Sequence, residues 1–328
     1  ICVEKVIEFL SLNSTTMRIG VDMMGGDYAP DATVKGAILA QQNMDSEAEL
    51  ILIGDSNKIK DILRNKGYPE DHFEIIHADQ IIQNGENPAK AFSKKPWSSI
   101  KLGFSLLEEG KIDGFASAGS TGAMMVGAMY TVKSLPGIIR PVITASVPQY
   151  DGGFAILLDV GINPDSKPDV LFQYGLIGSI YAQHVYKIDN PRVGLINIGE
   201  EEEKGNLVAR SAYELMNGTQ RYNFIGNIEG NQLFDSKADV LVCDGFVGNI
   251  ILKQAEATYK LIRKKGIRDE YFERFNFENI GGTPLLGVNG NIIIGHGISN
   301  EVAIKNMIIH TQYVIDANLS EQIKKAFQ

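Results

Sequence analysis

The stretch Val-Asp-Met-Met-Gly-Gly-Asp-Tyr-Ala-Pro at residues 21–30 decides how this chain is expected to fold. Residues 18–22 predict a short buried strand, because β-branched side chains alternate there and a turn follows directly. Gly25 and Gly26 allow a tight reversal, and Pro30 suits the first turn of a helix. A strand, a glycine turn and a helix N-terminus form a corner whose free N–H groups can bind an anion. The stretch matches neither GxGxxG nor a P-loop, so a plain tight turn is the competing interpretation.

The same strand, turn and helix pattern returns four more times along the chain. In the second corner, residues 114–118 form the predicted strand and Gly-Ser-Thr-Gly at 119–122 forms the turn. Ser120 and Thr121 place hydroxyl groups beside the unpaired N–H groups of the following helix, which makes this corner the strongest candidate for a phosphate site. The turns of the other three corners are residues 161–168, 199–206 and 245–249.

Alternating strands and helices predict an α/β fold, Rossmann-like, with a mostly parallel, doubly wound sheet and helices on both faces. The predicted strands are residues 18–22, 49–54, 73–77, 114–118, 154–160, 192–198, 238–244 and 291–294. In such sheets the loops that follow the strands gather at one edge, and ligands bind there. We therefore expect one cleft to be lined by the following residues: Gly25, Gly26, Ser120, Thr121, Asn163, Lys204, Asn249 and His296.

Composition narrows the class of protein. The chain has 328 residues and a formal net charge of −9, which argues against a nucleic-acid-binding protein. Cys2 and Cys243 provide neither a disulfide framework nor a metal-binding spacing, so they favour a reducing compartment such as the cytoplasm. No stretch is apolar for long enough to span a membrane. We interpret residues 1–16 as an N-terminal extension, and residues 17–328 as a single α/β domain with a helical excursion at about 250–280.

Basic residues concentrate in two places of this acidic chain. Residues 260–268 carry the densest basic cluster, at the end of a predicted helix, and Lys94 and Lys95 precede Trp97 in a polar loop. Such clusters attract an acidic protein or an anionic membrane surface. A solvated helix end and a solvated loop are the competing interpretations.

Absent motifs narrow the chemistry further. The chain contains no GxSxG, no HExxH and no metal ligands paired at helical spacing. Several glycine-rich helix N-termini and scattered lysines suit a reaction in which phosphate itself is the nucleophile, because phosphate needs only to be held, desolvated and aimed. N–H donors would also stabilise the oxyanion that forms when a carbonyl is attacked. Neither a metal nor an organic cofactor is predicted.

Seven motifs occur in order between Met17 and about Ile315. They are Val-Asp-Met-Met-Gly-Gly-Asp-Tyr-Ala-Pro (21–30), Ser-Ala-Gly-Ser-Thr-Gly-Ala (117–123), Leu-Asp-Val-Gly-Ile-Asn (158–163), Asn-Pro-Arg-Val-Gly-Leu-Ile-Asn-Ile-Gly (190–199), Lys-Gly-Asn (204–206), Cys-Asp-Gly-Phe-Val-Gly-Asn (243–249) and Pro-Leu-Leu-Gly-Val-Asn-Gly (284–290). Together they resemble the bacterial phosphate acyltransferase (PlsX) family. The resemblance implies a fold similar to the isocitrate dehydrogenase and phosphotransacetylase group. It also implies transfer of a fatty acyl group from acyl carrier protein to inorganic phosphate, which yields acyl phosphate for phospholipid synthesis.

The resemblance further implies a homodimer that can associate peripherally with the membrane. In this chain, however, the segment at residues 250–281 is shorter than the segment that forms the family's paired long helices.

We expect Lys94 or Lys204 to balance the charge of phosphate, and His296, which follows a strand between two glycines, to protonate the departing thiolate. The expected catalytic residues are His296, Lys204, Asn249 and Asn163. The expected phosphate- or substrate-binding residues are Gly25, Gly26, Asp27, Lys94, Ser117, Ser120, Thr121, Lys167, Asn206, Asp244 and Gly245. Residues 260–268, or Lys94 and Lys95, would dock the acidic carrier protein.

Two alternative functions stay open at this level. A dehydrogenase of the same fold would oxidise a phosphorylated hydroxy acid with NAD(P), usually with a divalent metal, and reduced nicotinamide would reveal it. A non-catalytic protein that binds phosphate or acyl carrier protein would bind both ligands and release no product.

Overall fold

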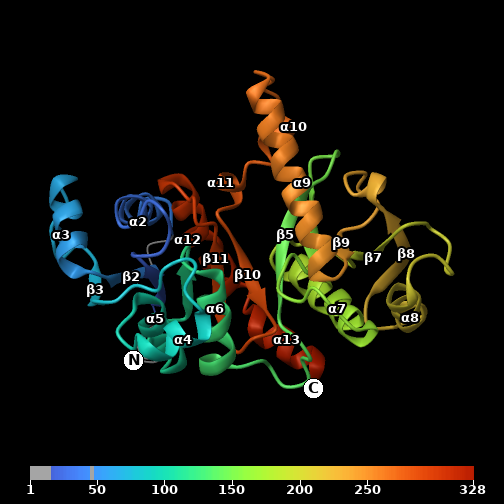
Figure 1. The fold of residues 1–328 in the computed structure, drawn as a ribbon, viewed down its shortest axis with the longest axis horizontal. Helices are drawn as coiled ribbons and strands as arrows, with labels where there is room; N and C mark the ends of the chain where they lie inside the picture. Colours follow the sequence, from blue (N-terminus) through green and yellow to red (C-terminus); the bar gives the residue numbers. More distant parts are fainter. Residues whose placement is uncertain (1–15, 45–47) are drawn as a thin grey trace, which may run out of the picture.

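The structure is a computed structural model that describes residues 16–44 and 48–328. The extension predicted at residues 1–16 therefore lies outside the described residues, apart from Thr16. Within the described part, eleven strands form one sheet in the order β3-β2-β1-β4-β11-β10-β5-β6-β9-β7-β8. Figure 1 shows the N-terminal strands at one end of this sheet, β5 and β10 in its middle, and β7 and β8 at the other end.

Two groups of parallel strands make up most of the sheet, so the predicted α/β fold with a mostly parallel sheet is confirmed. The first group comprises β1 (Met17–Asp22), β2 (Ala48–Gly54), β3 (Glu74–His77), β4 (Gly114–Ser117) and β11 (Asn291–Gly295). The second group comprises β6 (Phe154–Leu158), β7 (Arg192–Asn197), β8 (Asn223–Glu229) and β9 (Val240–Val242). The strands between the two groups are β5 (Val142–Pro148) and β10 (Gly282–Leu286).

Three successive antiparallel pairings connect the two groups: β11 with β10, β10 with β5, and β5 with β6. Because three reversals leave the groups running in opposite directions, their carboxyl ends do not share one edge of the sheet. The prediction of a single edge for all the loops is wrong in this respect. The loops of each group gather separately, and the two sets approach each other along the central strand β5.

Helices cover both faces of the sheet, as predicted. They are α2 (Asp31–Gln41), α3 (Ser56–Asn65), α4 (Pro88–Lys94), α5 (Ser99–Glu108), α6 (Thr121–Gly127) with the π-helix η1 (Ala128–Val132), α7 (Pro168–His184), α8 (Leu207–Met216), η2 (Gly230–Gln232), α9 (Gly245–Lys264), α10 (Glu270–Glu273), α11 (Phe277–Ile280), α12 (Glu301–Asp316) and α13 (Leu319–Phe327). Gly114 of β4 packs against α12, whereas its neighbour Phe115 packs against Gly103 of α5. Successive strand residues point to opposite faces, so α12 and α5 lie on opposite sides of the sheet.

Helix α9 begins earlier than predicted. Asp244 caps it, because its carboxylate accepts a hydrogen bond of 2.8 Å from the N–H of Val247. Residues 245–249, predicted to be a loop, are therefore the first turn of this helix. Figure 1 shows α9 rising from the middle of the molecule and extending beyond it. Among the described helices, none is both long enough and apolar enough to cross a membrane.

Candidate active site

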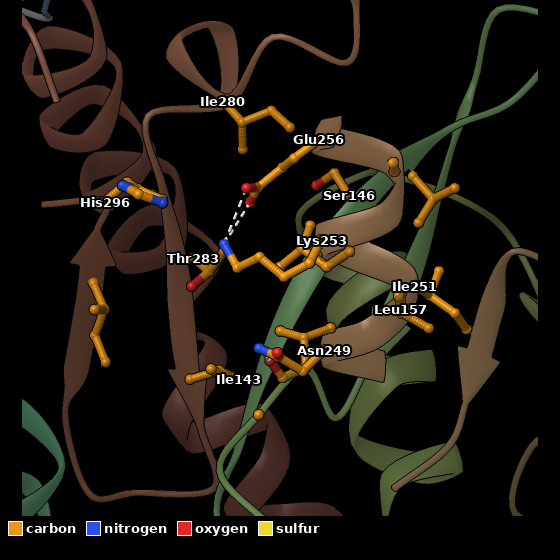
Figure 2. Close-up of a pocket in the computed structure, with 18 of the residues that line it drawn as sticks. Ile143, Ser146, Leu157, Asn249, Ile251, Lys253, Glu256, Ile280, Thr283 and His296 are labelled. Atoms are coloured by element: carbon orange, nitrogen blue, oxygen red, sulfur yellow. Dashed lines mark hydrogen bonds and ion pairs between the residues drawn. The ribbon is translucent and has the colours of Figure 1, made fainter. Parts of the chain in front are cut away.

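A cavity of about 390 Å³ lies between α9 and the centre of the sheet (Figure 2). Strands β5 and β10, the loop after β11 and one side of α9 form its walls. The polar side chains that line it are those of Thr121, Ser146, Asn249, Lys253, Glu256, Thr283 and His296. The structure therefore brings together three of the residues expected at the cleft, Thr121, Asn249 and His296, which follow three different strands, β4, β9 and β11.

Asp22 joins the loops that follow β1 and β4. One oxygen of its buried carboxylate accepts a hydrogen bond of 2.9 Å from the N–H of Met24, and the other accepts one of 2.7 Å from the hydroxyl of Ser117. The same hydroxyl accepts a hydrogen bond of 3.0 Å from the N–H of Gly119. Burial raises the pKa of Asp22 above its usual value, even though these hydrogen bonds lower it. Ser117, expected to bind substrate, thus supports the loop from within the core.

The glycine turn contacts both neighbouring loops. A Cβ atom on Gly25 would lie 2.6 Å from the backbone nitrogen of Gly119, so no side chain fits there. Gly26 has a φ of 106°, a left-handed conformation that favours glycine. The N–H of Asp27 donates a hydrogen bond of 2.7 Å to the carbonyl of Gly297, which lines the cavity. The turn therefore lies behind the cavity wall and fixes the loop that carries the candidate histidine.

His296 is half-buried at the end of β11, where Figure 2 shows it facing the polar residues of α9. Burial lowers the pKa of its imidazole, and the positive charge of Lys253 lowers it further, while Glu256 opposes this effect. The N–H of Ile298 lies 3.3 Å from Nδ1 and donates to it. A neutral imidazole that accepts this bond at Nδ1 carries its proton on Nε2.

Lys253 and Glu256 are cavity residues that sequence reasoning missed. The Nζ atom of Lys253 lies 2.9 and 3.0 Å from the two carboxylate oxygens of Glu256, whose side chain is 16% exposed. An opposite-charge pair three residues apart on a helix is typical of any solvated helix face. Only the position of α9 over the sheet shows that Lys253 is a cation at this cavity (Figure 2).

The lysines expected at the cleft lie elsewhere. Lys94 is exposed at the end of α4, and Lys167 is exposed just before α7. Lys204 is exposed in the loop before α8, where its Nζ lies 3.9 Å from the carboxylate of Glu201. None of these three lysines is among the described residues that line the cavity.

Asn163 is buried and belongs to the scaffold of the second strand group. Its N–H donates 2.6 Å to the carboxylate of Asp159, and its side-chain Nδ2 donates 2.8 Å to the hydroxyl of Tyr174 and 2.8 Å to the carbonyl of Pro141. The backbone of Gly245 packs against the same carboxylate, since a Cβ there would lie 2.7 Å from it. With its amide engaged in this way, Asn163 supports the loop instead of facing the cavity.

Asn249 reaches the cavity, whereas two other predicted residues lie on the opposite side of α9. Asn249 donates a hydrogen bond of 3.2 Å to the carbonyl of Val160 and lines the cavity. Asn206 and Asp244 line a second cavity of about 720 Å³, where each caps a helix. Ser120 is buried and caps α6, since its hydroxyl accepts a hydrogen bond of 3.4 Å from the N–H of Ala123.

Comparisons with known proteins agree with this architecture. The phosphotransacetylase from Streptococcus pyogenes superposes with a TM-score of 0.66 at 19% identity, covering 93% of this chain and 98% of that chain. The protein is thus an α/β protein with the phosphotransacetylase fold. A family model described as "Fatty acid synthesis protein" matches residues 17–271, and the chain belongs to this family.

Two relatives are similar in sequence to this chain over nearly the full length of both proteins. The phosphate acyltransferase of Halothermothrix orenii is 41% identical over 329 residues, which cover 94% of this chain and 98% of the relative. The phosphate acyltransferase of Desulfitobacterium hafniense is 42% identical over 330 residues, which cover 94% of this chain and 97% of the relative. The family resemblance expected from the motifs is therefore confirmed.

Proposed function

We propose that this chain is an acyltransferase that transfers a fatty acyl group from acyl carrier protein to inorganic phosphate, releasing acyl phosphate for phospholipid synthesis. The observation that carries the proposal is the single cavity in which Thr121, Asn249, Lys253 and His296 adjoin an apolar wall. The polar side chains suit an anion and a thioester carbonyl, and the apolar wall suits an acyl group. The names of the relatives, all phosphate acyltransferases, support the same reaction.

Phosphate would bind beside the start of α6. Thr121 is the first residue of that helix and is exposed to the cavity, so its hydroxyl and the first helical N–H groups are suited to phosphate oxygens. Lys253 would supply the balancing positive charge, in the role expected of Lys94 or Lys204. To do so it would share or exchange its contact with Glu256.

Asn249 and His296 would act on the thioester. An oxygen of hydrogen phosphate forms the new bond to the acyl carbon, the carbon–sulfur bond breaks, and the phosphate proton passes to the departing sulfur. The Nε2–H of a neutral His296 would donate a hydrogen bond to the charge that develops on the thioester oxygen, and the amide of Asn249 would add a second donor. The same imidazole could relay the proton to the thiolate, as expected from the sequence.

The basic cluster at residues 260–268 would dock the acyl carrier protein. Lys260 and Lys264 are exposed on the outer half of α9, the helix that also carries Lys253, and the exposed Lys265 follows them as its C-cap. An acidic carrier bound there would place its thioester arm along α9 toward the cavity. The alternative cluster is less suited, because the ammonium group of Lys95 lies 2.6 Å from Glu86 and also donates to a backbone carbonyl.

Assembly and location follow from the same family reasoning. We propose that residues 17–328 of each chain form one domain and that two chains associate as a cytoplasmic homodimer. This dimer would associate peripherally with the membrane. Phe246, Ile250 and Leu261 support this proposal, because they leave apolar surface exposed along α9.

The deciding experiment mixes the purified chain with a long-chain acyl carrier protein thioester and phosphate, then traps acyl phosphate with hydroxylamine. Acyl hydroxamate and free carrier thiol should form together, and omission of phosphate should abolish both. Reduction of added NAD(P) with a phosphorylated hydroxy acid, or binding of both ligands with no product, would favour one of the alternatives.

A further inference from the structure

Few residues of helix α9 are buried for a helix of its length. Of its twenty residues, all of them described, only Gly245 and Gly248 are buried. Ile251 and Leu252 are half-buried and pack against the core cluster that contains Leu157 and Leu241, and together with Ala255 they also line the cavity. A helix normally buries its apolar stripe against a core. These side chains of α9 thus border an apolar part of the cavity that the chain itself leaves unfilled.

Strands β5 and β10 are paired over only a short stretch next to this helix. Strands β5 and β10 pair at two positions, Ile143 with Leu285 and Val142 with Leu286. Beyond them, residues 144–148 of β5 pair with β6 on the other side. The cavity follows this open stretch of β5, and its floor includes Ala145, Val147 and Leu157. The floor and the inner side of α9 thus enclose an apolar slot that adjoins the polar residues of the site.

The slot has a polar side and an apolar side. Figure 2 shows His296 and Thr283 on one side of the cavity, with Ile251 and Leu157 on the opposite side. Phe234 and Phe275 also line the cavity, and their rings pack edge to face with centroids 5.6 Å apart. Phe275 packs further against Tyr271, at 5.5 Å. Phe275 belongs to the connection between α10 and α11, so this aromatic pair is the bulkiest part of the cavity lining on the apolar side.

We propose that the fatty acyl chain of the substrate lies in this slot, between α9 and strands β5 and β6, and that Phe234 and Phe275 limit its length. The proposal rests on the proposed function, which places the thioester near His296. A straight hydrocarbon chain matches a slot lined by aliphatic and aromatic side chains. Each methylene that the slot buries should improve kcat/KM about fourfold, until the chain reaches the aromatic pair.

A second route out of the cavity is less suited to a hydrocarbon. Ser146 and Ile280 line both this cavity and another on the far side of β5. The hydroxyl of Ser146 lies 2.6 Å from that of Tyr186, and His310 lines the far cavity as well. A tail that took this route would displace or face polar groups, which costs free energy. The acyl chain is therefore assigned to the slot under α9.

The test compares two substitutions on the same helix. Ala255→Phe fills the slot, whereas Ala257→Phe adds the same bulk at an exposed position two residues away. With palmitoyl and octanoyl carrier thioesters, Ala255→Phe should lower kcat/KM for palmitoyl at least about tenfold, the loss of roughly two buried methylenes, and spare octanoyl. Ala257→Phe should leave both unchanged. Phe275→Ala should improve use of chains longer than palmitoyl.

Each contrary outcome has a distinct meaning. Equal losses for both chain lengths with Ala255→Phe, or no loss, would overturn the slot. Loss of palmitoyl transfer with Ser146→Leu but not with Ala255→Phe would assign the tail to the far cavity instead. If the unaltered chain forms no acyl phosphate from any thioester, the proposed function fails, and binding of a fluorescent long-chain fatty acid then tests the slot by itself. Binding that Ala255→Phe abolishes and Ala257→Phe retains would support it; equal binding by both variants, or none by the unaltered chain, would overturn it.

Discussion

The hydroxyl of Ser117 donates a hydrogen bond of 2.7 Å to the carboxylate of Asp22, across a separation of 95 residues in the chain. This bond joins the ends of two neighbouring parallel strands, and the glycine turn and the turn before α6 follow directly from them. Asp159 has a similar role in the second group of strands, where it accepts hydrogen bonds from the loop that contains Asn163. Each group of loops is thus organised around one buried carboxylate that holds backbone N–H groups in place.

Replacing Ser117 by alanine should loosen the first of these loop pairs. The variant leaves a buried carboxylate without one of its donors, which should lower the free energy of unfolding by about 1–3 kcal/mol. Urea denaturation measures this change, and the Michaelis constant for phosphate should rise as the turns lose their register. Ser105→Ala removes a half-buried hydroxyl that donates to a carbonyl within α5 and serves as the control. Equal stability of the two variants would contradict the supporting role.

Lys253 and Lys204 make a matched test of which lysine binds phosphate. Lys253→Ala should raise the Michaelis constant for phosphate about tenfold or more, because a charge-assisted contact contributes roughly 1.5–3 kcal/mol. Lys204→Ala should leave it unchanged, since that side chain lies outside the cavity. Steady-state kinetics at varied phosphate distinguishes the two. The opposite ranking would return the role to Lys204, as expected from the sequence.

Particular residues show what sequence reasoning could reach. The strand at residues 18–22, the glycine turn and the helix at residues 207–216 were predictable, because turn glycines, caps and apolar periodicity are local signals. The antiparallel centre was not, because the pairing of β5 with β10 joins residues about 140 positions apart and nothing local encodes it. Lys253 was missed for the same reason, since its sequence neighbours do not reveal the strand beneath it. Asn163 was predicted to be catalytic, because nothing in the neighbouring sequence shows that its amide is bound to the carbonyl of Pro141, 22 residues earlier.

The acid limb of the pH profile should report on His296. Burial and Lys253 lower the pKa of its imidazole from the ordinary value of 6.5, so protonation of the residue in the folded protein has its midpoint below that pH. Activity should therefore persist as the pH falls through 6.5 and decline only at lower pH. His296→Gln should remove this limb and lower kcat by about 100-fold, the effect of losing one oxyanion donor. An acid limb centred above 6.5 would contradict a neutral imidazole in the reaction.

His310 should make stability depend on pH. It is buried, its Nε2 lies 2.8 Å from the hydroxyl of Tyr181, and its Nδ1 lies 3.0 Å from the carbonyl of Gly282. Burial lowers its pKa in the folded state, whereas the unfolded chain has the ordinary value of 6.5. Below pH 6.5 the unfolded state binds the extra proton, so the free energy of unfolding should fall as the pH falls.

Chemical denaturation at a series of pH values measures this linkage. His310→Gln removes the titrating group, so its stability should vary less than that of the unaltered chain between pH 6.5 and lower values. His72→Gln, which replaces an exposed histidine, should keep the full dependence. If the His310 variant loses stability on acidification as steeply as the unaltered chain, the buried imidazole is not the source.

Reversing charge at the outer end of α9 should weaken delivery of the acyl group without affecting phosphate. Lys264→Glu combined with Lys265→Glu places two acidic groups where the acidic carrier would dock, so the Michaelis constant for the carrier thioester should rise about tenfold at low salt. The difference should shrink as ionic strength rises, because salt screens exposed charges. Lys90→Glu combined with Lys94→Glu tests the other basic region as a matched control. A larger effect from the second pair would place the carrier over α4, and unchanged phosphate kinetics in both variants would show that the cavity is intact.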